Sequence, residues 1–204
     1  MKSYFLGDCD DDCDFDDSFE PVGGGLLDIA SEVEREKEEM RAREEAAKKK
    51  DPRPSWHNYF LKIAHDVAER SNCCRRKVGA VIVKDNHIIA TGYNGTPART
   101  TNCFDGGCPR CNHTHATGEK LDECLCVHAE QNAICQAAKH GNSVDRAHIY
   151  ITCSPCLTCL KLIINSGITC VEFSEWYKPF NEQELNLIKE AGLVVIPPKE
   201  ERGL

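Results

Sequence analysis

The sequence predicts an α/β fold, a three-layer α/β/α sandwich around one mixed five-stranded sheet. Short apolar stretches typical of strands alternate with helical patterns from residue 55 to residue 198. Two of these stretches, VGAVIVK and HIIATGY, are separated only by Asp85 and Asn86, which predicts a hairpin. A chain of 204 residues is long enough for one such domain and an additional segment.

The N-terminal segment differs in composition from the rest of the chain. Residues 1–25 are acidic, low in complexity and end in three glycines, which is typical of a disordered tail. Residues 26–50 combine high helix propensity with many charges of both signs, so we expect an exposed, charged helix there. Pro52 and Pro54 would end this helix, and the folded domain is therefore expected over residues 55–198.

The first half of the domain predicts a helix, the hairpin and a long loop. Ser55 is a suitable N-cap, and the residues after it are apolar at helical spacing: Trp56, Tyr59, Phe60, Ile63, Ala64 and Val67. The hairpin follows, and then a loop of about residues 95–124 that is rich in cysteine, glycine and histidine.

The second half alternates helices with strands. A helix is expected to begin near His128 and to end at Gly141, and AHIYIT predicts the next strand. A helix with Pro155 in its first turn, the strand ITCVEFS, a helix over residues 182–191 and the strand LVVI complete the sheet.

The charge of the chain is unevenly distributed. Residues 1–50 hold 16 acidic and 8 basic side chains, whereas residues 51–204 hold 17 of each, which places the net charge of -8 in the N-terminal segment. Binding to polyanions depends on clustered lysines and arginines. A neutral domain therefore argues against polymeric nucleic acid as a partner, whereas a small ligand with one phosphate is compatible with it.

Cysteine usage indicates metal binding or reduced thiols. No stretch resembles a signal peptide or is long and apolar enough to cross a bilayer, so we expect a cytoplasmic or nuclear protein that does not bind membranes. Many of the 14 cysteines have C-x-x-C or C-x-C spacing. In a reducing compartment this spacing favours metal binding over the alternative, a disulfide framework.

Two short motifs predict a catalytic metal site. CLCVHAEQNAI contains His128 and Glu130, and SPCLTC contains Cys156 and Cys159, each motif at the expected start of a helix. One imidazole and two thiolates leave the fourth position of a tetrahedral zinc site open for water, as in catalytic sites. Glu130 would lie near that water without binding the metal and would move its proton. A Cys-x-x-Cys pair alone is more often half of a structural zinc site.

The two motifs together are the H-x-E…P-C-x-x-C signature of zinc nucleobase deaminases. With VGAVIV, TGYNGTP, CVHAEQNAI, IYIT, NSGITCVEF and GGCPRCN, they make residues 56–198 resemble the deoxycytidylate (dCMP) deaminase family of the cytidine deaminase superfamily. The resemblance implies a cytidine deaminase-like fold and hydrolysis of dCMP to dUMP and ammonia, supplying dUMP for thymidylate synthesis. Zinc hydroxide would attack C4 of the cytosine, with Glu130 as the proton shuttle.

The resemblance also implies residues that bind the substrate. Asn94 matches the asparagine that contacts the sugar, and Tyr177 matches an aromatic position near the nucleotide. Ala129 would orient the pyrimidine through its backbone. The phosphate needs a cation or several amides, for which Arg75, Arg76 and Lys178 are candidates.

Regulation and assembly are implied in the same way. Many members of the family respond to dCTP and dTTP with Mg²⁺ and are homo-oligomers, often hexamers. The effector loop of the family corresponds here to residues 92–99, with Gly92, Asn94, Gly95 and Arg99 as the matching positions.

The remaining cysteines predict a second, structural zinc. The expected ligands are Cys73, Cys103, Cys108 and Cys126, which match positions in phage and bacterial members, with Cys111 and Cys124 as alternates. Cys135, Cys153 and Cys170 lie in apolar segments and are interpreted as core thiols.

Two other functions remain open at this point. One is a deaminase acting on dCTP or another cytosine nucleotide, because the residues that would bind further phosphates cannot be placed. The other is a non-catalytic zinc-binding regulatory module, although Glu130 and all three ligands of the expected catalytic site are present.

Overall fold

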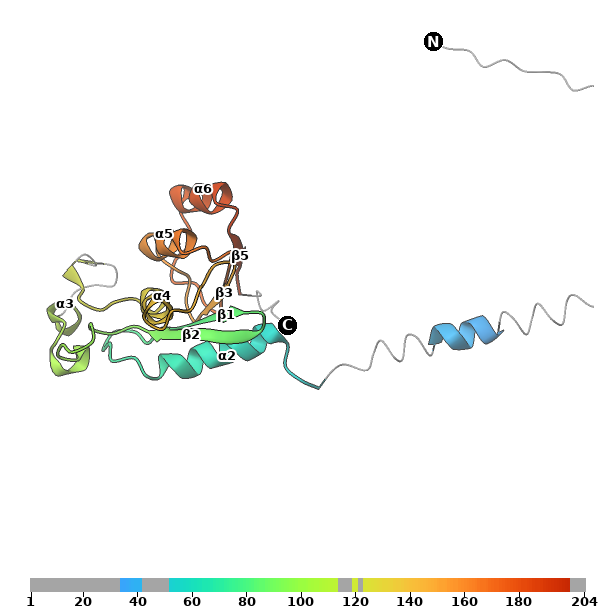
Figure 1. The fold of residues 1–204 in the computed structure, drawn as a ribbon, viewed down its shortest axis with the longest axis horizontal. Helices are drawn as coiled ribbons and strands as arrows, with labels where there is room; N and C mark the ends of the chain where they lie inside the picture. Colours follow the sequence, from blue (N-terminus) through green and yellow to red (C-terminus); the bar gives the residue numbers. More distant parts are fainter. Residues whose placement is uncertain (1–33, 42–51, 114–118, 121–122, 199–204) are drawn as a thin grey trace, which may run out of the picture. The chain divides into compact units, whose positions relative to one another are not determined.

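The computed structural model describes residues 34–41, 52–113, 119–120 and 123–198. The chain divides into two units, Met1–Pro52 and Arg53–Leu204, each considered by itself. In the first unit, residues 34–41 are helical and exposed (Figure 1). They lie within the helix predicted over residues 26–50, whose other residues, like the tail predicted over residues 1–25, lie outside the described residues.

The second unit contains one mixed five-stranded sheet. Its order is β2-β1-β3-β4-β5; β1 pairs antiparallel with β2 and β3, and the pairs β3–β4 and β4–β5 are parallel. The strands are β1 (Gly79–Lys84), β2 (His87–Tyr93), β3 (His148–Ile151), β4 (Cys170–Phe173) and β5 (Val194–Ile196). The sequence-based prediction of a mixed five-stranded sheet is confirmed.

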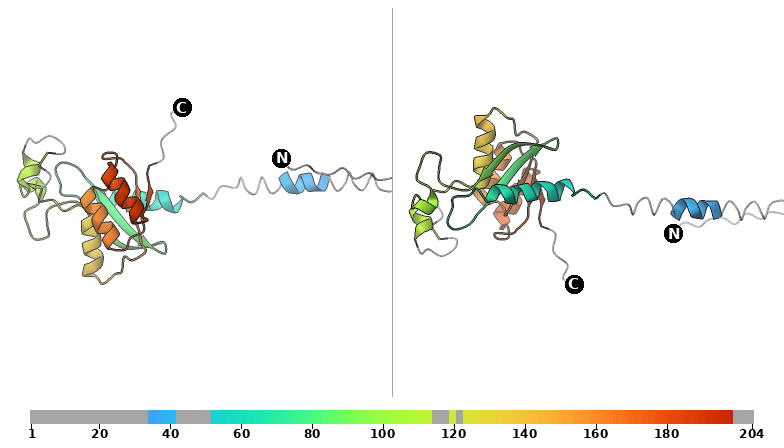
Figure 2. Two further views of the ribbon diagram at one scale, coloured as in Figure 1. Left: turned by 90° about the horizontal axis from the view of Figure 1, so that it is seen from above. Right: turned by 90° about the horizontal axis from the view of Figure 1, so that it is seen from below.

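Helices cover both faces of this sheet. Figures 1 and 2 show α2 (Trp56–Ala68) on one face, while α4 (Ala129–Lys139), α5 (Leu157–Asn165) and α6 (Glu182–Glu190) cover the other. The predicted three-layer α/β/α sandwich is therefore confirmed. The helix expected to include Pro155 begins two residues later, with Cys156 as its N-cap.

Alternation along the central strands produces two separate cores. Ala80, Ile82, Ile149 and Ile151 face the layer of three helices and belong to a large cluster with Leu160, Ile163, Val171 and Phe173. Val81, Val83 and Tyr150 point to the opposite face and pack against Phe60, Leu61 and Ala64 of α2. Successive strand residues point to opposite faces, so strands between two helical layers are apolar throughout.

Helix α2 begins as the sequence predicts, but its buried face is narrower. The Ser55 hydroxyl accepts a hydrogen bond from the Asn58 amide, as an N-cap does. Trp56 and Tyr59 are, however, 55% and 43% exposed, and their rings pack against the ring of Phe60.

The hairpin turn is formed by Asp85 and Asn86, both with positive φ, 51° and 61°. Two consecutive left-handed residues are typical of a type I′ turn, whose twist matches that of the strands. The predicted hairpin is thus present with the predicted turn residues.

The cysteine-rich segment after β2 contains two short helical turns, η1 (Cys103–Asp105) and α3 (Pro109–Asn112). They lie beyond one end of the sheet (Figure 1). An isolated antiparallel bridge between Gly95 and Val127 closes this segment at its base. Among the described residues, we find no helix with the length and apolar character needed to cross a membrane.

Candidate active site and thiol cluster

The first turns of α4 and α5 bring the predicted metal ligands together. His128 is the N-cap of α4, where its backbone N–H donates to Oε1 of Gln131 at 3.0 Å. Cys156 is the N-cap of α5, and Cys159 lies one turn further along that helix. Helix α5 connects the parallel strands β3 and β4, so its N-terminus is held at the edge where β3 ends.

The three side chains converge on one point. Nδ1 of His128 lies 3.5 Å from Sγ of Cys156 and 3.3 Å from Sγ of Cys159. Bonds of about 2.0 Å to nitrogen and 2.3 Å to sulfur in a tetrahedral site place these atoms about 3.5 Å apart. The donor atoms therefore fit a zinc ion with one position left for another ligand, in agreement with the sequence-based prediction.

The electrostatics of this group suit a cation. A hydrogen bond from Cys159, and then one from His128, lowers the pKa of Cys156 to about 3 despite its burial. The same hydrogen bond, together with burial, raises the pKa of Cys159. Two thiols thus compete for one proton beside an imidazole, and a bound metal ion would allow both to ionise.

Glu130 is the second residue of α4 and is only 4% exposed. Burial raises the pKa of its carboxyl group, although the neighbouring His128 acts in the opposite direction. A carboxyl group with a raised pKa exchanges a proton with bound ligands near neutral pH more readily than an ordinary glutamate does. Its position beside the metal-ligand group fits the proton shuttle that the sequence predicts.

A cavity of about 780 Å³ opens in front of these residues. Its lining includes His128, Ala129, Glu130 and Cys156, the predicted substrate residues Asn94 and Tyr177, and the phosphate candidates Arg75, Arg76 and Lys178. Cavities of about 300–1,000 Å³ are typical of small-molecule sites. The structure thus brings all the predicted substrate residues to one cavity.

Asn94 is held in place by the Ser71 hydroxyl and by two backbone groups. Its Oδ1 accepts from the Ser71 hydroxyl at 2.7 Å and from the Val78 amide at 2.8 Å. Its Nδ2 donates to the Arg76 carbonyl at 2.8 Å. A side-chain amide has two N–H donors, so one remains for a ligand in the cavity.

The basic residues of the cavity have different partners. The Arg76 guanidinium lies 5.0 Å from the centre of the Tyr177 ring and donates to Sγ of Cys153 at 3.1 Å. Lys178 donates to the buried carboxylate of Glu184 at 3.1 Å. Arg76 keeps its charge uncompensated by a carboxylate in these contacts, which favours it over Lys178 for binding an anion.

The four predicted effector residues do not form one exposed surface. Gly92, Asn94 and Gly95 are buried, and only Arg99 is exposed. Gly92 lies against α4, where an added Cβ would come within 2.3 Å of the Ala129 carbonyl and the Ala133 amide. Gly92 therefore has a structural role, because it allows the close approach of β2 and α4.

Six thiols gather beside the cavity, here called the thiol cluster: Cys73, Cys103, Cys108, Cys111, Cys124 and Cys126. The structure groups them differently from the predicted quartet. Cys73, Cys103 and Cys126 lie together with Cys111, whereas Cys108 lies with Cys111, Cys124 and Cys126. Cys108 is the N-cap of α3, and the helical turn after it brings Cys111 to the centre. The CPRC spacing indicates that Cys108 and Cys111 lie close together, but the sequence alone does not show that Cys111 belongs to both groups.

The other cysteines are partly as predicted. Cys153 is buried and Cys170 half-buried, but Cys135 is exposed on α4 and is not a core thiol. Cys74, to which the sequence assigns no role, lies next to the cluster with its Sγ 3.7 Å from that of Cys103. Sequence reasoning also missed Ser154, a buried cavity residue whose Oγ accepts from the Tyr177 amide at 2.9 Å.

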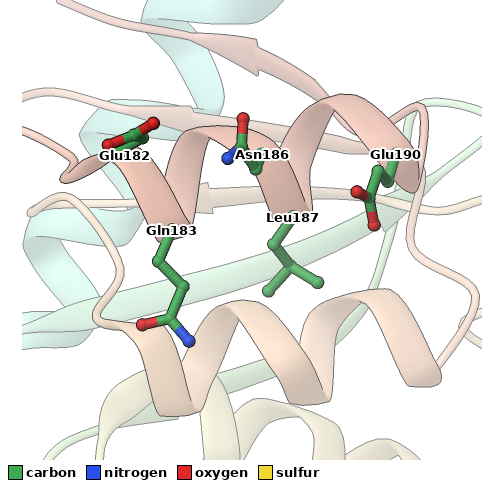
Figure 3. Close-up of a pocket in the computed structure, with 5 residues that line it drawn as sticks. All are labelled: Glu182, Gln183, Asn186, Leu187 and Glu190. Carbon is green, nitrogen blue, oxygen red and sulfur yellow. The ribbon is translucent and has the colours of Figure 1, made fainter.

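A second depression lies on α6 (Figure 3). Glu182, Gln183, Asn186, Leu187 and Glu190 line it, and it contains none of the metal-ligand groups described above. Two of the five lining side chains are carboxylates, which repel a phosphate-bearing ligand. It is therefore not the candidate site.

Comparison with known proteins agrees with this geometry. Residues 54–175 match the cytidine and deoxycytidylate deaminase zinc-binding region. The deoxycytidylate deaminase of Saccharomyces cerevisiae is 47% identical over 143 residues, which cover 70% of this chain and 45% of that protein. The ComE operon protein 2 of Bacillus subtilis is 42% identical over 146 residues, covering 70% of this chain and 71% of that protein.

The deoxycytidylate deaminase of Schizosaccharomyces pombe is 45% identical over 152 residues, covering 72% of this chain and 46% of that protein. The chain thus spans slightly less than half the length of the Saccharomyces and Schizosaccharomyces relatives.

Solved structures show the same fold. The dCMP deaminase of the cyanophage S-TIM5, in complex with dCMP and dUMP, superposes with a TM-score of 0.57 at 32% identity. The superposition covers 72% of this chain and 99% of that chain. The fold, the converging ligands and the match over residues 54–175 lead to one conclusion: this chain belongs to the cytidine and deoxycytidylate deaminase zinc-binding family.

Proposed function

We propose that this protein catalyses the zinc-dependent hydrolytic deamination of dCMP to dUMP and ammonia. The observation that carries the proposal is the buried Glu130 carboxyl group beside the group of His128, Cys156 and Cys159, at the wall of one cavity. Relatives named deoxycytidylate deaminase, and a structural neighbour that binds dCMP and dUMP, support the choice of substrate.

The chain supplies a metal site and a proton carrier. A zinc ion held by His128, Cys156 and Cys159 would lower the pKa of a water molecule to about 7 and so provide the nucleophile at neutral pH. Glu130 accepts the proton of this water and donates protons to N3 of the pyrimidine and to the departing amine. Its raised pKa suits the first step, because it makes the Glu130 carboxylate a stronger base, and the carboxylic acid that forms then donates the proton in the second step.

The rest of the cavity would orient the nucleotide. The remaining N–H of Asn94 is available for the sugar, and the backbone of Ala129, at the start of α4, for the pyrimidine. Arg76 and Tyr177 form a cation–π pair at the same cavity, which presents a guanidinium to the phosphate. Substrate roles for these residues are part of the proposal.

The first experiment compares dCMP, dCTP, CMP and deoxycytidine as substrates, with turnover followed by the loss of ultraviolet absorbance of the aminopyrimidine. Selective turnover of dCMP is expected. Preference for dCTP would replace the substrate assignment while leaving the chemistry intact. No turnover of any of the four by zinc-loaded protein would overturn the proposal in favour of a non-catalytic zinc-binding module.

The proposal extends to further properties that the family suggests. They are a structural zinc in the thiol cluster, response to dCTP and dTTP with Mg²⁺ at the loop of residues 92–99, assembly into a homo-oligomer such as a hexamer, and a cytoplasmic or nuclear location. The thiols of the cluster support the first, because they are grouped at metal-binding distances. Adding dCTP or dTTP with Mg²⁺ to the dCMP assay tests the second, and measuring the mass of the native protein tests the third.

A further inference from the structure

The thiol cluster is assembled from three separate parts of the chain. Cys73 precedes β1, Cys103, Cys108 and Cys111 belong to the turns after β2, and Cys124 and Cys126 precede α4. Among the residues that the structure describes, the buried members of this cluster are all cysteines, with no aliphatic or aromatic side chain buried among them. Sulfur therefore takes the place of a hydrophobic core in this part of the domain.

The six thiols form two overlapping groups of four. One contains Cys73 and Cys103, the other contains Cys108 and Cys124, and both contain Cys111 and Cys126. Within each group all four sulfurs lie within 4.8 Å of one another. Two tetrahedra that share an edge have this arrangement, in which two corners belong to both.

The distances between the sulfurs match such tetrahedra. Sγ of Cys111 lies 4.0 Å from that of Cys73, 3.6 Å from that of Cys124 and 4.0 Å from that of Cys126. The sulfurs of Cys108 and Cys124 are 3.9 Å apart. Zn–S bonds of about 2.3 Å in a regular tetrahedron place sulfurs about 3.8 Å apart. A disulfide would need about 2.05 Å, so the described distances fit metal binding and not oxidation.

We propose that the thiol cluster binds two zinc ions as one binuclear centre, in which Cys111 and Cys126 are thiolates that bridge both ions. Cys73 and Cys103 complete the first ion's coordination, and Cys108 and Cys124 complete the second. The inference deepens the structural-zinc part of the proposed function and does not depend on the reaction.

A single zinc ion could not bind all six thiols of the cluster. It would use four sulfurs and leave two further thiols at the same small site, with Cys103, Cys108 and Cys111 buried away from water. Two ions give every one of the six sulfurs a metal bond. The thiols release their protons on binding, so six negative charges meet four positive ones.

The remaining charge of about minus two has nearby compensation. Arg75, Arg76 and Arg110 line the same cavity as Cys73, Cys111 and Cys126. Arg110 is buried, and its guanidinium donates two hydrogen bonds to the Glu119 carbonyl, which fixes the charge beside Cys111 in the chain. Positive charge of this kind stabilises thiolates.

Cys74 provides a matched control. It is exposed, its Sγ lies 3.7 Å from that of Cys103, and it belongs to neither group of four. Its Sγ donates to the Cys111 carbonyl at 3.4 Å, an interaction that serine can keep. Cys74→Ser should therefore leave the metal content unchanged although it alters a thiol next to the site.

The test measures bound metal in the full-length protein after saturation with zinc and removal of excess. We expect three zinc ions per chain in the wild type, two in His128→Ala, which lacks an active-site ligand, and three in Cys74→Ser. Two in the wild type and one in His128→Ala would show a mononuclear cluster and overturn the proposal. One zinc ion in the wild type and none in His128→Ala would show that the thiol cluster binds no metal, and this result would also overturn the proposal.

The bridges are tested by ¹¹³Cd NMR of the cadmium-substituted wild type and of His128→Ala. Two thiolate-shifted signals that are coupled to each other through the bridging sulfurs are expected in both proteins. Two uncoupled signals, or one signal, in His128→Ala would contradict shared ligands. His128→Ala is expected to lack activity, and its spectrum reports only on the thiol cluster. The test of the binuclear centre is therefore independent of the proposed reaction.

Substitution of a bridge should differ from substitution of a terminal ligand. Cys111→Ser should lose both metals of the cluster, whereas Cys124→Ser should retain at least one. Equal losses in the two variants would argue against a bridging role for Cys111. If Cys111→Ser does not fold, the spectrum of the wild type decides.

Discussion

At the scale of single residues, Glu130 separates metal binding from chemistry. Glu130→Gln keeps the size of the buried side chain but removes its acid–base function, and the residue is not among the three that converge as ligands. We expect kcat for dCMP to fall by about 10²- to 10⁴-fold, with zinc content and melting temperature close to those of the wild type. Steady-state kinetics and metal analysis check this, and full activity of the variant would contradict the mechanism.

A second residue-scale feature lies on the opposite face of the sheet. The buried Glu172 of β4 is ion-paired with His57, and Nε2 of His148 lies 3.4 Å from its Oε2. Burial, and then the charge on His57, lowers the pKa of His148 from its ordinary value of 6.5 to about 4. His148 is therefore neutral in the folded protein above about pH 4, although it lies beside the Glu172 carboxylate.

This shift predicts a loss of stability in mild acid. Between pH 6.5 and about 4 the unfolded chain binds a proton at His148 and the folded protein does not. The free energy of unfolding should therefore decrease as the pH falls through this range. His148→Gln should show a weaker decrease than the wild type in urea titrations at pH 7, 6 and 5. Since acid also releases metal from thiolates, the difference between the two proteins is the relevant quantity, and identical slopes would refute the assignment.

At the scale of elements, the position of α4 on the sheet depends on a glycine. The space at Gly92 on β2 is filled by the α4 backbone, with the Ala129 carbonyl and the Ala133 amide 2.3 Å from the position that a Cβ would take. Gly92→Ala should therefore push away the helix that carries Glu130. We expect a loss of about 1–3 kcal/mol in the free energy of unfolding and a reduced kcat.

The control for Gly92→Ala lies on the same strand. Ile88 is exposed on β2, so Ile88→Ala changes a strand residue without touching α4. Chemical denaturation and dCMP kinetics of both variants should show an effect only for Gly92→Ala. If Gly92→Ala kept the stability and kcat of the wild type, α4 would have to move aside without cost, which would contradict the tight packing of β2 against α4.

The elements also show which features a sequence can predict. The hairpin follows from Asp85 and Asn86, and the first turns of α4 and α5 from local cap and motif signals, so these were predictable. The grouping of six thiols was not, because it depends on how three distant segments meet. The exposure of Trp56 likewise depends on which other elements pack against the first turn of α2, and spacing within a helix does not show this.

At the scale of the whole molecule, the two units predict separate roles. The second unit begins at Arg53 and contains every residue of the cavity and of the thiol cluster. A variant that lacks residues 1–50 should therefore bind the same amount of zinc and deaminate dCMP with unchanged kcat and KM. Metal analysis and kinetics beside the full-length chain test this, and a marked loss of activity would assign the N-terminal unit a part in catalysis.

The Gly95–Val127 bridge links the two metal-ligand groups through the backbone. Each of these residues donates its amide to the other's carbonyl, at 3.1 Å and 2.8 Å, and Val127 stands between Cys126 and His128. An amide exchanges its hydrogen with solvent only when such a bond opens. The exchange rate of the Val127 amide therefore measures how often the backbone next to His128 opens. We expect bound zinc to lower this exchange rate, and hydrogen–deuterium exchange of the zinc-loaded and the metal-free protein measures the difference.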